Sequence, residues 1–139
     1  MENKKEHINP NGLFKNPAFS QVVSTQGNGK TIYIGGQNGV DKKAEIVGRN
    51  DIASQTEQAL KNLKIALKSS EADYGNLVKP NIYIVQGQDL RKSFEASRKL
   101  LANISKQPIV TVLFVAGLAN PDYLIEIDAI AFIPEKTKE

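Results

Sequence analysis

The sequence contains no cysteine and only one histidine, His7, among its 139 residues. Disulfide bonds and thiolate metal sites are therefore excluded. Because His7 lies in a polar segment that we predict to be an N-terminal tail, Ser–His and Cys–His catalysis lack a base or a thiol. No set of residues has the spacing of a metal site, so we expect no metal ion.

Long hydrophobic runs are also missing. The longest, PIVTVLFVAGLA, is too short to cross a bilayer. The first ten residues, MENKKEHINP, are charged and lack the apolar core of a secretory signal peptide. We therefore expect a cytoplasmic protein without a membrane partner.

The length predicts one domain over residues 1–139, with polar tails at 1–16 and 134–139. The charge is mild, with 18 Lys and Arg against 15 Asp and Glu, a net charge of +3. Three lysines recur at helical spacing, and we interpret them as a solvated helix surface rather than a nucleic-acid stripe. They are Lys61, Lys64 and Lys68. Nucleic acid is not the expected partner.

The glycine-rich stretch STQGNGKTIYIGGQNGVD raises the question of a phosphate-binding loop. The pattern GxxxxGK[ST] requires a first glycine where Ser24 stands, and the residues after Lys30 are typical of a strand rather than a helix. We therefore predict a β-hairpin, in which Asn28-Gly29 helps to join strands over 19–25 and 30–36. The cluster of Gly35, Gly36 and Gly39 is expected to end the second strand and to admit a sharp turn or a ligand.

Apolar periodicity predicts two helices and three further strands. One helix is expected over 51–69, capped by Asp51 or Asn50, and the other over 89–104, capped by Asp89. The three strands are expected over 76–86, 108–118 and 122–133. Pro80 predicts an edge or a bulge near the start of its strand. The order β-β-α-β-α-β-β, with right-handed crossovers, predicts an α+β sheet with both helices on one face.

The other face of this sheet is expected to need a cover. Both sides of the predicted strand 108–118 are apolar, and only Thr111 interrupts the pattern. Two helices on one face cannot cover both sides, so we predict that a second subunit does. A long loop is the alternative.

The predicted strand 122–133 carries two carboxylates at alternate positions. Its apolar set, Ile125, Ile127, Ala129, Ala131 and Ile133, suits packing under helices. Glu126 and Asp128 fall on the opposite face, roughly 7 Å apart. Each either holds or delivers a proton in a buried site, or pairs with a lysine or reaches solvent.

Several stretches resemble the Rid (reactive-intermediate deaminase, or YjgF) family over about residues 14–133. They are NPAFSQ, YIGGQNGVD, QTEQALKNLKIAL, NLVKPNIYIV and LIEIDAIA. The resemblance implies a chorismate-mutase-like fold and a homotrimer with small-molecule clefts between subunits. It also implies hydrolysis of reactive enamines and imines to ketoacids and ammonia, without a metal or a cofactor.

The resemblance assigns a role to individual residues. Glu126 matches the residue that positions the attacking water, and Gly36 matches a glycine that lines the cleft. Val110 stands where active members have an arginine that clamps the substrate carboxylate, Phe19 where they have a tyrosine, and Phe94 where they have an asparagine. With Thr111 and Val112, these residues are the candidate ligand-binding set.

The missing arginine leaves several functions open. Its loss should cost several kcal/mol of binding to an amino-acid-derived imine, unless a lysine or Arg91 reaches in from a neighbouring subunit. An apolar or uncharged ligand is therefore favoured. The candidate functions are an enamine/imine deaminase of altered specificity, a non-catalytic ligand-binding or regulatory module, and an RNA-binding protein or ribonuclease.

Overall fold

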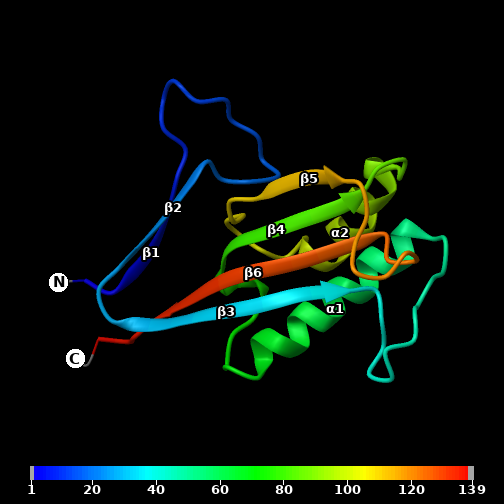
Figure 1. Ribbon diagram of the computed structural model, residues 1–139. Helices are drawn as coiled ribbons and strands as arrows, with labels where there is room; N and C mark the ends of the chain where they lie inside the picture. The colour runs from blue at the N-terminus through cyan, green and yellow to red at the C-terminus, as the bar shows by residue number, and fades with distance from the viewer. Residues whose placement is uncertain (1, 138–139) are drawn as a thin grey trace.

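A four-stranded sheet with two helices on one face forms the centre of the molecule (Figure 1). The computed structural model describes residues 2–137. Its elements, in chain order, are β1 (Lys4–Ile8), β2 (Val22–Gln26), β3 (Gly29–Asn38), α1 (Ile52–Lys68), the short 3₁₀ helix η1 (Tyr74–Asn76), β4 (Leu77–Val85), α2 (Leu90–Leu101), β5 (Thr111–Val115) and β6 (Ile125–Pro134).

The main sheet has the strand order β3-β6-β4-β5. Strands β4 and β5 are parallel, whereas β6 is antiparallel to both of its neighbours. The helix α2 connects β4 to β5, and α1 connects β3 to β4. This arrangement confirms the predicted α+β fold with both helices on one face (Figure 1).

The predicted hairpin between the first two strands is wrong. Strand β2 pairs with β1 in a separate two-stranded sheet, and β3 pairs with β6 instead. The turn between β2 and β3 does form, because the Asn3 side chain accepts a hydrogen bond from the Asn28 amide at 2.8 Å. Beyond that turn the two strands diverge, and the β1–β2 arm extends from one end of the main sheet (Figure 1).

The N-terminal segment is not a tail over its whole length, since Lys4–Ile8 forms β1. His7, which we expected to be solvated, is half-buried, and its Nδ1 lies 2.9 Å from the Gln107 carbonyl oxygen. At the other end, Pro134 belongs to β6, and residues 138–139 of the predicted tail lie outside the described residues.

Two glycines of the cluster, Gly35 and Gly36, lie within β3 rather than at its end, and Gly39 directly follows the strand. The register with β6 shifts between Ile34 and Gln37, so Gly35 and Gly36 together oppose the single residue Asp128. Two residues against one is a β-bulge, which bends the strand and redirects its side chains. Strand β3 then continues to Asn38.

The helix starts agree with the predicted caps. The Asp51 carboxylate accepts hydrogen bonds from the amides of Ala53 and Ser54, and Asp89 accepts one from the amide of Arg91. Helix α2 ends at Leu101, three residues before its predicted end. Pro80 lies in the interior strand β4, beside a register shift between Leu77 and Lys79, so the bulge alternative is confirmed.

The core lies between α1 and the helix-facing side of the sheet. The predicted alternation in β6 is confirmed, because Ile125, Ile127, Ala129 and Ala131 are all at most 2% exposed. The lysine stripe on α1 is solvent-exposed and paired with carboxylates, Lys61 with Glu57 and the other two with Asp73. None of the helices within residues 2–137 is long and apolar enough to span a membrane.

Candidate functional site on the open face of the sheet

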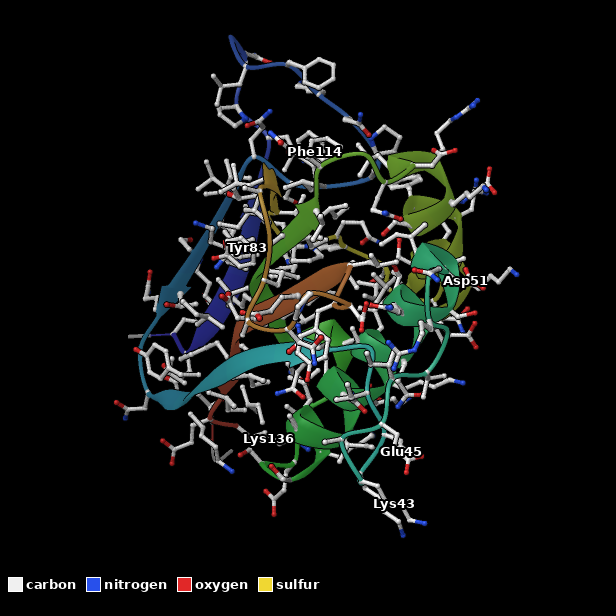
Figure 2. All side chains as sticks on the ribbon, turned by 45° about the vertical axis from the view of Figure 1, so that its right-hand side comes forward. Lys43, Glu45, Asp51, Tyr83, Phe114 and Lys136 are labelled. Atoms are coloured by element: carbon white, nitrogen blue, oxygen red, sulfur yellow. The ribbon has the colours of Figure 1, made fainter. Side chains whose placement is uncertain are left out.

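The face of the four-stranded sheet opposite α1 and α2, here called the open face, gathers polar side chains in two rows. Paired residues on neighbouring strands point to the same side of a sheet. The first row is Asn38, Glu126, Tyr83 and Leu113; the second is Asp128, Asn81 and Thr111. Both predicted carboxylates therefore lie on this face, and both are half-buried. Tyr83, on β4, pairs with Glu126 on one side and with Leu113 of the edge strand β5 on the other, and is labelled in Figure 2.

Glu126 is held by an amide rather than by a cation. The Asn38 Nδ2 donates to Glu126 Oε1 at 3.2 Å and to the Ile125 carbonyl at 3.0 Å. Asn62 on α1 in turn donates to the carbonyls of Asn38 and Val40. The helix thus fixes the end of β3, and the end of β3 fixes one oxygen of the carboxylate.

Gly36 makes room for the other oxygen of Glu126. A Cβ atom placed on Gly36 would lie 2.3 Å from Glu126 Oε2, which is so close that the Glu126 side chain would have to move. The neighbouring Gly35 is different, because no described atom lies within 4 Å of the same added atom. The bulge therefore brings the β3 main chain directly under the carboxylate at one glycine and not at the other.

Asp128 has its own amide partner, since Asn81 Nδ2 donates to Asp128 Oδ1 at 2.7 Å. The charge of Asp128 raises the pKa of the Tyr83 phenol, and burial, a hydrogen bond to Asp128 and the charge of Glu126 add to this effect. Across residues 2–137, no Lys or Arg forms an ion pair with either carboxylate. The sequence left open that a lysine pairs with these carboxylates. In the structure Asn38 and Asn81 are their partners instead.

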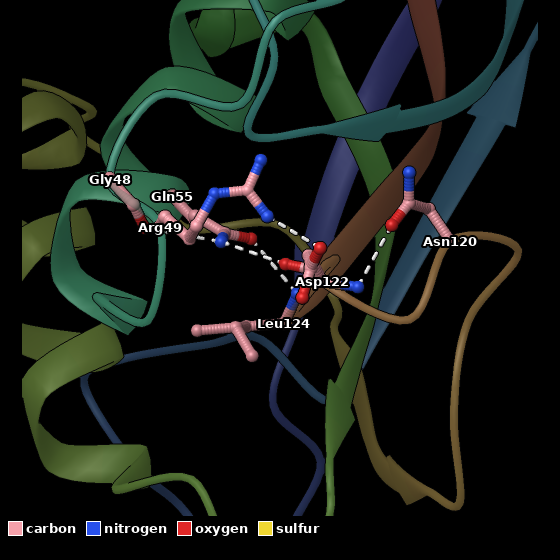
Figure 3. A network of polar contacts seen from close by, with 6 residues as sticks. All are labelled: Gly48, Arg49, Gln55, Asn120, Asp122 and Leu124. Atoms are coloured by element: carbon pink, nitrogen blue, oxygen red, sulfur yellow. Dashed lines mark hydrogen bonds and ion pairs between the residues drawn. The ribbon is translucent and has the colours of Figure 1, made fainter.

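The start of β6 is anchored by a buried amide on α1 (Figure 3). Gln55 is fully buried and donates to the carbonyls of Gly48 and Asp122 at 3.2 and 3.1 Å. Its Oε1 accepts from the Leu124 amide at 2.9 Å. The ion pair between Arg49 and Asp122 closes the same network at the surface. These bonds set the position of the backbone two residues before Glu126.

A single chain brings only part of the predicted ligand-binding set together. Gly36 and Thr111 share the open face with Glu126. Val112 pairs with Ile82 and faces the helix side. Phe94 lies on α2 with 48% of its surface exposed, and Phe19 lies in the loop between β1 and β2, against Phe14. Val110 directly precedes β5 and is half-buried.

Sequence reasoning missed three polar residues of the open face. Asn81 and Tyr83 alternate with Ile82 and Ile84 in the stretch NIYIV, so the period of two could have placed them beside the carboxylates. Asn38 gave no such signal, because its orientation depends on the bulge at Gly35 and Gly36.

The fold and this site define an α+β domain whose uncovered sheet face carries two amide-held carboxylates. Residues 14–133 match the family described as endoribonuclease L-PSP. The chain therefore belongs to this family, which is also called the YjgF or Rid family.

Relatives of the chain include proteins with and without an assigned activity. It is 31% identical to human 2-iminobutanoate/2-iminopropanoate deaminase over 113 residues, 81% of this chain and 78% of the human protein. It is 29% identical to a RutC family protein of Pyrococcus horikoshii over 114 residues, 82% and 86% of the two chains. The Rid family protein YyfB of Yersinia pestis, described as of unknown function, superposes with a TM-score of 0.82 at 28% identity, covering 93% and 98% of the chains.

Proposed function

We propose that this protein binds a small metabolite in clefts between the subunits of a homotrimer and hydrolyses enamines or imines to a ketoacid and ammonia. The proposal is carried by one observation. Glu126 is seated over Gly36 and held by Asn38 on a sheet face that no helix of residues 2–137 covers. The name of the human relative supports the reaction class. We expect the protein to act in the cytoplasm.

Glu126 suits the water-activating step of this reaction. Imine hydrolysis adds a water oxygen to the carbon of the C=N bond while a proton reaches the nitrogen. The new hydroxyl group then loses its proton and forms the C=O bond as the C–N bond breaks, and the nitrogen takes up a proton and leaves as ammonia. A carboxylate that accepts a hydrogen bond from the water orients it and takes up the proton that the water loses. Asn38 occupies one oxygen of Glu126, which leaves the other to contact the water.

The substrate we propose carries its carboxylate where a neighbouring subunit can pair with it, which gives a ketoacid, or lacks a carboxylate, in which case the product is an aldehyde or a ketone. Val110 offers no charge at the position where the family resemblance expects an arginine. Glu126 and Asp128 would repel a substrate carboxylate placed between them. Altered specificity follows from this charge pattern.

The trimer is proposed because the open face exposes apolar side chains beside the carboxylates. Leu113 is 49% exposed and Tyr33 is 78% exposed, and both belong to strands of the sheet. Such surfaces usually mark association sites. The β1–β2 arm contacts β6, but it leaves Leu113 and Tyr33 exposed. Association through the open face would add residues from a second chain to the Glu126 site.

The sharpest experiment uses the two adjacent glycines of the bulge. Gly36→Ala should displace the Glu126 carboxylate without removing it, and should lower the rate of hydrolysis of imines formed in situ by about 10- to 100-fold. Gly35→Ala, in the same bulge with open space around its added methyl group, should stay within about twofold of wild type. Circular dichroism would confirm that both variants fold. Equal rates of hydrolysis for the two variants would show that the position of the Glu126 carboxylate does not matter for the reaction.

A non-catalytic ligand-binding or regulatory module is the second candidate, favoured by Val110 in place of a cationic clamp. It predicts that metabolites raise the Tm without turnover, and that wild type and Glu126→Gln show the same background rate on every imine tested. An RNA-binding or ribonuclease role is the third candidate and fits the mild charge least well. It predicts RNA affinity that falls steeply with salt.

A further inference from the structure

We infer that a groove on another part of the molecule, between β1, η1 and the segment after α2, binds a small organic polyanion. The groove has a volume of about 600 Å³, which suits a metabolite-sized ligand. Its walls include Lys5, His7, Lys64, Tyr74, Ile104 and Lys106. None of the residues in the two rows of the open face lines it, so this site is separate from Glu126.

The groove carries an excess of positive charge. Lys5, Lys64 and Lys106 contribute three ammonium groups, and Asp73 is the one carboxylate among the described residues that line it. Asp73 is already shared by two lysines, Lys64 at 3.8 Å and Lys68 at 3.0 Å. The remaining cations of the groove therefore face a space that no protein anion neutralises.

Lys5 is the most informative of these cations. Its Nζ donates to the carbonyl oxygens of Gly75 in η1 and of Leu77 at the start of β4, and the side chain is half-buried. Within the described chain, no carboxylate lies at ion-pair distance from it. Burial accordingly lowers the pKa of Lys5. A desolvated ammonium without a counter-charge is unfavourable, and a bound anion would supply that charge.

His7 adds a group whose charge can change with the ligand. Its Nδ1 donates to the Gln107 carbonyl, which leaves Nε2 without a proton in the neutral ring. Burial lowers the pKa of His7, and the charges of Lys5 and Lys106 lower it further, whereas the bond to Gln107 opposes them. An anion between these groups favours the protonated ring. Binding should therefore take up a proton and strengthen as the pH falls.

The walls also indicate the shape of the ligand. Leu100 and Ile104 provide apolar contact on one side, and the cations come from β1, α1 and the segment after α2. A compact molecule with two or more phosphate or carboxylate groups and a short carbon skeleton fits this arrangement. A nucleic-acid strand would need a continuous basic track, and the lysines on α1 beside the groove are already paired with Glu57 and Asp73.

The experiment measures binding of citrate and of pyrophosphate by calorimetry and by amide chemical shifts of the full chain. We expect saturable binding below 10 mM, with shifts at residues 5–7 and 103–106 and none at 35–38. Lys106→Gln should weaken binding about threefold and Lys5→Met about tenfold. Lys42→Gln, on the exposed loop after β3, is the matched control and should bind like wild type. A titration from pH 8 to pH 5.5 should strengthen binding in wild type and less so in His7→Gln.

Three outcomes would overturn the proposal. One is the absence of saturable binding of either probe. Another is equal weakening by Lys42→Gln and Lys106→Gln, which would indicate diffuse charge. The third is a preference for a short single-stranded RNA over both probes, with a steep salt dependence. Because Lys106 is exposed, Lys106→Gln is expected to fold even if Lys5→Met does not.

Discussion

The two faces of β6 differ in what covers them. On the helix side, the four residues at every second position from Ile125 to Ala131 are buried. On the open face, the residues between them include Glu126 and Asp128, which are half-buried and held by amides. The first face is covered by the chain itself, whereas the second carries polar groups beside exposed apolar side chains, for which we propose a ligand and another subunit as the cover.

The largest effect should come from the closed face. Ile127 is 1% exposed, so Ile127→Ala should lower the free energy of unfolding by about 2–5 kcal/mol, because a cavity replaces the lost contacts. Ile130, on the open face of the same strand, is the matched position. Ile130→Ala should cost about 1 kcal/mol or less in dilute protein, and more at concentrations where copies associate. Urea denaturation at two protein concentrations tests both, and equal losses at both positions would erase the contrast.

The buried amide that anchors β6 should come next. Gln55→Ala leaves the Leu124 amide and the Asp122 carbonyl without their partner, and should cost about 2–3 kcal/mol. Gln58 on the same helix is a control, since its side chain donates only to Asn62 Oδ1 among the described contacts. Gln58→Ala should cost about 0.5 kcal/mol or less. Comparable values from denaturation curves would mean that the network in Figure 3 does not hold the strand.

A smaller effect is expected for the residue that orients Glu126. Asn38→Ala removes the bond to Oε1 and should reduce imine hydrolysis by about fivefold to tenfold, as expected for the loss of one hydrogen bond of about 1 kcal/mol. The neighbouring Gln37 donates to the Gly35 carbonyl instead and is the control. The reduction should appear mainly in kcat, since Asn38 acts through Glu126. A change confined to KM would assign Asn38 to substrate binding.

The smallest effect concerns the pH dependence of stability. In the folded protein the pKa of His7 lies below its ordinary value of 6.5, so the unfolded chain binds the proton more readily. The contribution of His7 to stability is therefore present above pH 6.5 and is lost as the pH falls below it. Unfolding measured at pH 7.5 and pH 5.0 should show a smaller acid loss in His7→Gln than in wild type. An identical loss in both proteins would show that other groups cause it.

Local patterns predicted the elements whose cause is local. The alternation in β6, the apolar stripe of α1 and the caps Asp51 and Asp89 depend on neighbours a few residues away, and all were predicted correctly. Strand β1 was missed because KKEHI is polar and lacks a clear alternation. It is a strand because β2 pairs with it and because Lys5 and His7 bond to distant carbonyls.

The candidate site divides in the same way. Glu126 could be assigned to the open face from its position in the alternating strand. It also lies within residues 14–133, which match the family model. Its partners could not be assigned, since Asn38 reaches it only because the bulge at Gly35 and Gly36 shifts the register. The groove beside β1 could not be predicted from the sequence either, because the cations that line it lie far apart in the chain.

The amino-acid sequence by itself determined the α+β pattern, the buried face of β6 and the placement of two carboxylates opposite that face, because periodicity and capping act within a few residues. Only the tertiary structure decided that β3 pairs with β6 rather than β2, that Asn38 holds Glu126, and that Lys5 and His7 border a groove. Those outcomes depend on contacts between residues many positions apart, whose formation follows from how the whole chain buries its apolar surface.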